Sequence, residues 1–106
     1  MRYDLAILKG GIIDGAGNPW YRADIGIAEG RIRLIGRLDG SAREKIDAEG
    51  LVVSPGFIDM HSHSDLQLLV NPLAESKIRQ GVTTEVIGNC GSSPAPLNEY
   101  TREEER

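Results

Sequence analysis

The first part of the chain contains short apolar runs that end at glycine or at other turn-forming residues. Residues 5–8 are apolar and are followed by the Gly pair 10–11, where this run is expected to end. Residues 12–13 form a second apolar run before the turn-forming stretch 14–19. A third run, residues 51–53, leads into Ser-Pro-Gly. Runs of this length between turn formers predict β-strands.

The clearest pattern in this part of the chain predicts a hairpin. Apolar and polar positions alternate over residues 24–28 and again over residues 31–34. Glu29 and Gly30 lie between the two segments, and Gly can adopt the positive φ of a tight turn. The alternation predicts strands with one buried and one solvent-facing side.

The pattern changes in the second half of the chain. The mostly apolar residues 57–60 predict a buried strand of the parallel type. A helix is predicted next, with Asn71 as its N-cap, Pro72 at its first position and Gly81 just past its end. The β-branched segment 82–87 predicts another strand. A strand, a helix and a strand within about 30 residues predict a parallel strand pair.

Two further expectations concern helices. Glu75 and Arg79 are four positions apart and are expected to form an ion pair on the predicted helix. Asn98 is expected to cap a further helix that is unfinished at Arg106. Because one strand-helix-strand unit cannot cover both faces of its sheet, we expect the chain to be the N-terminal part of a larger protein. The alternative is a complete small domain with an acidic tail.

Composition narrows the classes of protein to consider. The 106 residues are 40% hydrophobic and 26% charged, which is typical of one small soluble domain and not of a disordered chain. A net charge of -4 argues against nucleic-acid and anionic-membrane partners. A single Cys suits a reducing compartment, and no apolar run is long enough for a signal peptide or a membrane span. We therefore expect a cytoplasmic protein.

Two histidines follow the apolar segment 57–60. His61 and His63 are two positions apart, and side chains at i and i+2 of a strand point to the same face. Both imidazoles can therefore converge at the carboxyl end of the strand, which is the functional end of parallel α/β folds. Position alone is compatible with a pair of zinc ligands and also with two polar loop residues.

The single cysteine follows the next predicted strand. If the two strands are parallel neighbours, Cys90 can face the same space as the histidines, and a thiolate is a strong zinc ligand. The residues alone leave three alternatives open. Cys90 is a zinc ligand, a buried structural cysteine, or a nucleophile paired with His61 or His63.

Two aspartates flank the histidine pair at a distance of two residues. Asp59 would share the face of His61 in a continuing strand, where its carboxylate could accept a hydrogen bond that orients the imidazole. Asp65 could act in the same way or at the substrate. The alternative for each is a surface or loop carboxylate.

A resemblance to known proteins begins at the histidine pair. The amidohydrolase superfamily has a first barrel strand similar to residues 54–65, SPGFIDMHSHSD, and its histidine pair binds the catalytic metal. The segment at residues 80–96, QGVTTEVIGNCGSSPAP, resembles the D-aminoacylase (N-acyl-D-amino-acid deacylase) family, in which the Gly-Asn-Cys-Gly cysteine is a zinc ligand. Dihydroorotase-like and hydantoinase-like relatives instead use a carboxylated lysine from a later strand.

The resemblance implies a fold and a metal site. Residues 1–54 correspond to an N-terminal β-sandwich segment. Residues 55–106 correspond to the first βαβ unit of a metal-dependent (β/α)8 barrel that is incomplete in this chain. His61, His63 and Cys90 become the ligands of one or two Zn²⁺ ions.

The resemblance also implies a reaction, the hydrolysis of an N-acyl-D-amino acid to a D-amino acid and a carboxylate. The family's two further histidine ligands, its aspartate base and its substrate-binding residues have no counterpart before Arg106. No catalytic residue is therefore assigned within this chain, and we expect the chain alone to be inactive. The alternatives are an amidohydrolase acting on a cyclic amide and a small metal-binding module that is not an enzyme.

Overall fold

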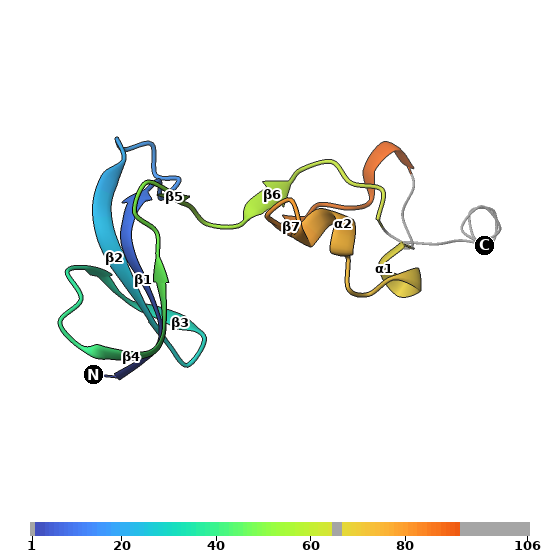
Figure 1. The fold of residues 1–106 in the computed structure, drawn as a ribbon. Helices are drawn as coiled ribbons and strands as arrows, with labels where there is room; N and C mark the ends of the chain where they lie inside the picture. The colour runs from blue at the N-terminus through green and yellow to red at the C-terminus, as the bar shows by residue number, and fades with distance from the viewer. Residues whose placement is uncertain (1, 65–66, 92–106) are drawn as a thin grey trace. The chain divides into compact units, whose positions relative to one another are not determined.

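The computed structural model describes residues 2–64 and 67–91 (Figure 1). The chain divides into two compact units, Met1–Pro55 and Gly56–Arg106. Among the described residues, no helix has the length and the apolar composition needed to cross a membrane.

The first unit is a single β-sheet built around its first strand. Its strands are β1 (Arg2–Ile12), β2 (Tyr21–Ala28), β3 (Arg31–Gly36), β4 (Ser41–Asp47) and β5 (Val52–Val53). They lie in the order β3-β2-β1-β4, and β5 also pairs with β1. The neighbours β1–β2 and β2–β3 are antiparallel, whereas β4 and β5 run parallel to β1 (Figure 1). Strand β1 therefore holds pairing partners from three later parts of the chain.

The expectation that the first strand ends at the glycine pair is wrong, because β1 continues through Gly10 and Gly11. A β-bulge takes up the irregularity: Lys9 has a φ of 61°, and the register with β2 shifts between Ile7 and Gly10. A Cβ atom on Gly10 would lie 2.6 Å from Cγ2 of Val53. The glycine thus allows β5 to approach β1 closely instead of ending the strand.

One carboxylate secures the bulge in β1. Asp24 of β2 accepts hydrogen bonds from the backbone N–H of Lys9 at 2.9 Å and from that of Leu38 at 3.0 Å. The N–H groups of Leu38 and Lys9 hold the pKa of Asp24 below its ordinary value, because they stabilise the ionised carboxylate. Asp24 thereby connects the irregular position in β1 to the segment that follows β3.

The predicted hairpin is confirmed. Glu29 and Gly30 both have positive φ values, 53° and 71°, at the turn between β2 and β3. Ile25 belongs to the buried cluster of this unit with Ile12 and Ala23. On β3 the predicted burial is not observed for Ile32, whose side chain is 59% exposed. A register shift between Gly26 and Ile27 breaks the predicted alternation, so Ile32 pairs with Ile27 and Leu34 with Gly26, on opposite faces of the sheet.

Strand β4 was not predicted from the sequence. Its residues, Ser-Ala-Arg-Glu-Lys-Ile-Asp, show no regular alternation, and only Ala42 is even partly buried. It forms because its backbone pairs with β1, from Arg2 opposite Ser41 to Leu8 opposite Asp47. A strand that forms through backbone pairing of this kind is not indicated by the order of its apolar and polar side chains.

The second unit contains a pair of strands separated by two short helices. Its elements are β6 (Phe57–Asp59), α1 (Gln67–Val70), α2 (Glu75–Ile78), β7 (Val82–Glu85) and the 3₁₀ turn η1 (Asn89–Gly91). Strands β6 and β7 pair in parallel, as the strand-helix-strand order predicts. The carboxyl ends of the two strands consequently meet at the same edge.

The prediction of a helix that starts at Asn71 and Pro72 is wrong. Asn71 lies after α1 and donates its backbone N–H to the carbonyl of Gln67, while α2 begins only at Glu75. Pro72 has no N–H to donate, and Ala74 takes a left-handed φ of 48°, so the helical path is broken between α1 and α2. Gly81 follows α2 with a φ of 86°, as expected for a residue past a helix end.

Three other expectations differ from the structure or lie outside it. Glu75 and Arg79 share a backbone hydrogen bond in α2, but their side chains form no ion pair within the described segments. Phe57 and Ile58 of β6 are exposed, although a buried strand was predicted, because the described residues supply no layer that covers them. The helix predicted to start at Asn98 lies outside the described residues.

Replacing Asp24 with Asn should destabilise the first unit in a pH-dependent way. The variant loses charge-assisted hydrogen bonds, so its free energy of unfolding should fall by about 1–2 kcal/mol at neutral pH. Because folding lowers the pKa of Asp24, its contribution is complete above about pH 4 and disappears as the pH falls through the folded pKa. Urea denaturation followed by the fluorescence of Trp20, the only tryptophan, measures this difference.

The matched control is Asp39→Asn, because Asp39 is exposed and its carboxylate makes no hydrogen bond or ion pair with the described residues. It should unfold like the wild type. An equal effect of Asp24→Asn at pH 7 and at pH 3 would contradict the role of the ionised carboxylate.

Candidate metal centre

The histidine pair lies in the loop that leaves β6. The strand ends at Asp59, one residue earlier than predicted, so His61 and His63 are loop residues rather than strand residues. Their rings are nevertheless close, with centroids 5.1 Å apart and planes inclined by 61°. Ser62, between them, is 3% exposed, whereas both imidazoles are exposed. Burial of Ser62 therefore directs the two histidines outward from the same loop.

Cys90 approaches the histidines from the loop that follows β7. It lies in η1 with a φ of 56° and a ψ of 29°, a left-handed conformation that is uncommon for a residue other than glycine. Its Sγ atom is 3.3 Å from Nε2 of His61. Such a backbone conformation persists only where the surroundings hold it, and it is found frequently at functional sites.

The three predicted site residues converge. One donor atom from each of His61, His63 and Cys90 lies within 4.8 Å of the others, and all three side chains are exposed. Tetrahedral zinc with two nitrogen ligands and one sulfur ligand would separate the donors by about 3.3–3.6 Å. The distance of 3.3 Å between Cys90 and His61 fits that geometry. The donor set is therefore suited to a transition metal such as zinc.

Backbone pairing brings the two loops together. Beyond β6, the N–H of Val86 donates to the carbonyl of Asp59 at 2.8 Å, and the N–H of Ser62 donates to the carbonyl of Val86 at 3.0 Å. These bonds continue the parallel pairing past the ends of both strands. The backbone at Ser62, between the two histidines, is thereby fixed against the strand that leads to Cys90.

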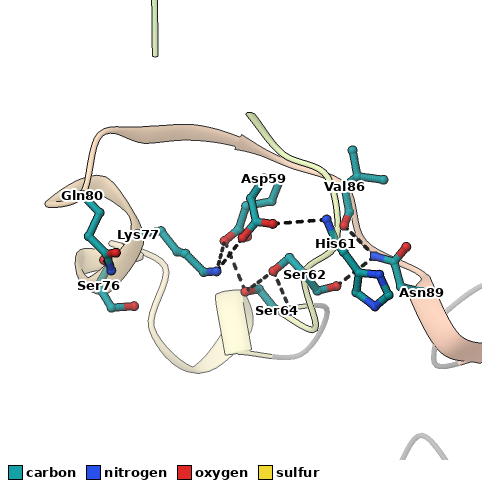
Figure 2. Close-up of polar contacts among 10 residues, drawn as sticks. Asp59, His61, Ser62, Ser64, Ser76, Lys77, Gln80, Val86 and Asn89 are labelled. Atoms are coloured by element: carbon teal, nitrogen blue, oxygen red, sulfur yellow. Dashed lines mark hydrogen bonds and ion pairs between the residues drawn. The ribbon is translucent and has the colours of Figure 1, made fainter. Parts of the chain in front are cut away.

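Asn89 strengthens this connection and was missed by the sequence analysis. Its side-chain amide donates to the carbonyl of Ser62 at 3.2 Å and to that of Val86 at 2.8 Å (Figure 2). The residue next to Cys90 thus holds the histidine loop directly. The only signal in the sequence is that this Asn stands beside the cysteine in a glycine-rich loop.

Asp59 acts on the backbone of His61 and not on its ring, which corrects the expectation that its carboxylate orients the imidazole. One carboxylate oxygen accepts the N–H of His61 at 3.1 Å, and the other accepts a hydrogen bond from Nζ of Lys77 at 2.7 Å. The hydrogen bond from Lys77, followed by that from His61, lowers the pKa of Asp59. The same contact with Asp59 raises the pKa of Lys77. Both groups are therefore charged at neutral pH.

A second carboxylate completes this polar network. Glu85, at the end of β7, has a side chain that is only 10% exposed and lies 3.8 Å from Nζ of Lys77. It accepts a hydrogen bond from the hydroxyl of Ser64 at 3.3 Å, and the hydroxyls of Ser62 and Ser64 lie 2.8 Å apart. No local sequence pattern links these residues. The other flanking aspartate, Asp65, lies outside the described residues.

Comparison with protein families identifies the class of this chain. Residues 44–100, which include all three converging side chains, match the amidohydrolase family. The match covers more than half of the 106 residues. The chain belongs to the amidohydrolase family.

Individual relatives are similar over most of the chain. A D-aminoacylase from Alcaligenes xylosoxydans xylosoxydans is 51% identical over 96 residues, which are 90% of this chain and 20% of the relative. An N-acyl-D-glutamate deacylase from the same organism is 50% identical over 99 residues, or 91% of this chain and 20% of that relative. The chain thus spans about a fifth of the length of these curated relatives.

Solved structures agree with the sequence relatives. A D-aminoacylase studied for its binuclear metal centre superposes with a TM-score of 0.84 at 50% identity, covering 90% of this chain and 20% of that one. N-acyl-D-glutamate deacylase from Bordetella bronchiseptica, in complex with zinc and a phosphonate inhibitor, gives a TM-score of 0.83 at 50% identity over 92% of this chain and 21% of that one. The described fold therefore matches the N-terminal part of D-aminoacylase.

Replacing Asn89 with Asp should loosen the contact between the two loops. A carboxylate cannot donate to the carbonyls of Ser62 and Val86, and its charge would repel them. We expect the backbone N–H groups of Ser62 and Val86 to exchange with solvent deuterium at least about tenfold faster, which corresponds to roughly 1.4 kcal/mol of lost protection. Hydrogen exchange measured by NMR tests this.

Asn71→Asp makes the same chemical change at an exposed position whose side chain has no hydrogen bond to the described residues. It should leave exchange at Ser62 and Val86 unaltered. Equal exchange rates in the wild type and Asn89→Asp would contradict the role assigned to the Asn89 amide.

Proposed function

We propose that this chain forms the N-terminal part of a zinc-dependent hydrolase that cleaves the amide bond of N-acyl-D-amino acids. The products are a D-amino acid and a carboxylate. The observation that carries the proposal is the convergence of His61, His63 and Cys90 within 4.8 Å, in a chain about 50% identical to D-amino-acid deacylases. The substrate is a small molecule, and neither the charge nor the motifs of the chain favour a nucleic acid or a membrane.

The proposed metal site consists of two imidazole nitrogens and one thiolate. Nitrogen and sulfur ligands favour zinc over Mg²⁺ and Ca²⁺, which prefer oxygen ligands. Bound zinc would supply a Lewis acid beside the scissile carbonyl. The exposure of His61, His63 and Cys90 supports the proposal, since a ligand set at the surface of this unit is accessible to further ligands and to substrate.

Each candidate ligand must be in a particular protonation state to bind the metal. Cys90 must bind as the thiolate and both histidines must be neutral, so metal binding releases a proton to the solvent. The left-handed backbone at Cys90 aims its Sγ toward His61. The chain's own contribution is thus to hold three donors in place before the metal arrives, which reduces the cost of ordering them.

We assign residues 1–54 to an N-terminal β-sandwich segment and residues 55–106 to the first βαβ unit of a (β/α)8 barrel. Two observations support this assignment. Strands β6 and β7 are parallel, and the candidate ligands follow their carboxyl ends, which is where barrel enzymes carry their active sites. The first unit exposes an apolar sheet face, as one layer of a sandwich would.

Zinc binding by the full 106-residue chain is the first test of this proposal. We expect His61→Ala, His63→Ala and Cys90→Ala each to weaken binding at least about tenfold, because each removes one ligand. Isothermal titration calorimetry in buffers of different ionisation enthalpy measures both the affinity and the released proton. The chain has no His or Cys outside this site, so no matched variant of another such residue is available as a control. Mg²⁺ and Ca²⁺, which prefer oxygen ligands, serve as the control instead and should not bind. Retention of wild-type affinity in all three variants would contradict the metal site.

The reaction itself is tested with the protein at its natural length. We expect hydrolysis of N-acetyl-D-amino acids in preference to their L-enantiomers, loss of activity in Cys90→Ala, and no activity for the 106-residue chain alone. Ninhydrin detection of the released amine measures the rate. Turnover of a hydantoin or of dihydroorotate without deacylation would favour the cyclic-amide class instead. Turnover by the isolated chain that depends on Cys90 would contradict the expectation that the catalytic base lies elsewhere.

A further inference from the structure

We propose that Lys77 is a positioning residue for the metal centre: its single ammonium group fixes both ends of the loop that carries His61 and His63. This inference rests on the proposed metal site and adds a residue to it that contacts no candidate ligand side chain. Figure 2 shows the Lys77 side chain reaching from α2 toward Asp59.

The ammonium group of Lys77 joins the ends of two strands. Its Nζ lies 2.7 Å from Oδ2 of Asp59, the last residue of β6, and 3.8 Å from Oε1 of Glu85, the last residue of β7. Glu85 is largely shielded, with an exposed fraction of 10%, whereas Asp59 and Lys77 are partly shielded, with exposed fractions of 25% and 35%. Shielded charges of opposite sign interact more strongly than charges on an open surface.

A positive charge is required at this place because the two carboxylates face each other. Asp59 and Glu85 are paired positions in the parallel register of β6 and β7. Like charges at paired positions repel and would separate the strand ends. Lys77 replaces that repulsion with two attractions, which add to the backbone hydrogen bonds that already join the strand ends.

Each carboxylate then holds one end of the histidine loop. Asp59 accepts the backbone N–H of His61 at 3.1 Å, which fixes the start of the loop. Glu85 accepts the hydroxyl of Ser64 at 3.3 Å, and that hydroxyl lies 2.8 Å from the hydroxyl of the buried Ser62. The two histidines lie between these anchors. A change at Lys77 is therefore transmitted to both imidazoles through the backbone.

The expected consequence is a change in metal affinity. Residues that orient metal ligands without touching the metal typically affect the affinity by about tenfold to hundredfold when they are replaced. We expect Lys77→Met to weaken zinc binding by this factor. Lys77→Arg keeps the charge and should restore most of the affinity, whereas a residue that only filled space would be replaced equally well by Met.

The experiment compares zinc affinities of the full chain by competition with a chromophoric chelator. The matched control is Arg79→Met, which removes the same charge two residues away, from a side chain without a hydrogen bond or ion pair to the described residues. It should bind zinc like the wild type. Absorption of the Co²⁺-loaded chain supplies a second measurement, because the thiolate and ligand-field bands should shift in Lys77→Met and not in Arg79→Met.

A second pair of variants tests the route through Asp59 and guards against misfolding of Lys77→Met. Asp59→Asn removes the charge but retains an oxygen that can accept the N–H of His61. If Lys77 acts through Asp59, the double variant Lys77→Met/Asp59→Asn should lose less affinity than the product of the two single losses. Because it leaves only the Glu85 carboxylate without its cation, whereas Lys77→Met leaves two such carboxylates, it should also fold at least as well as Lys77→Met, as circular dichroism will show.

The outcomes separate the two proposals. A wild-type chain that binds no zinc overturns the metal site and, with it, the role of Lys77. Wild-type binding with equal affinity and an unchanged Co²⁺ spectrum in Lys77→Met overturns the role of Lys77 alone. Multiplicative losses in the double variant overturn the route through Asp59, and a loss of affinity in Lys77→Met that Lys77→Arg reverses supports the proposal.

Discussion

The parallel pairing of β6 with β7 is the constraint on which the candidate metal centre depends. Two parallel neighbours end at the same edge, so residues that follow them in the chain are delivered to one place although 29 positions separate His61 from Cys90. Two backbone hydrogen bonds extend the pairing beyond the strands and stop the loops from diverging. The ligand geometry thus begins with the backbone pairing, and side-chain hydrogen bonds from Asn89 and to Asp59 reinforce it.

The same pairing creates the electrostatic problem that the polar network solves. Strand ends that meet also bring their last side chains together, and here both are carboxylates. Lys77 from α2 balances them, and the hydroxyl of Ser64 donates to the same Glu85 oxygen that the ammonium group approaches. This polar network contributes to both the stability of the second unit and the geometry of the site, since none of the apolar side chains described in that unit is fully buried.

Local sequence patterns predicted the parts of this structure that depend on neighbouring residues. The hairpin at Glu29 and Gly30 and the convergence of His61 with Cys90 follow from turn chemistry and strand order. Strand β4 could not be predicted, because its partner β1 lies about 40 residues away and selects it through the backbone. The contacts of Lys77 were equally inaccessible, since the sequence predicts one continuous helix from Asn71, whereas α2 begins only at Glu75.

The arrangement of the first sheet has a consequence for synthesis on the ribosome. Strand β1 is made first, yet its parallel partners β4 and β5 are complete only at residue 53. At translation rates of about 5–20 residues per second, one edge of β1 stays unpaired for roughly 2–8 seconds after the strand itself has been made. The antiparallel β2 arrives earlier and pairs with the opposite edge of β1, so β1 itself keeps a single open edge while it awaits the rest of the sheet.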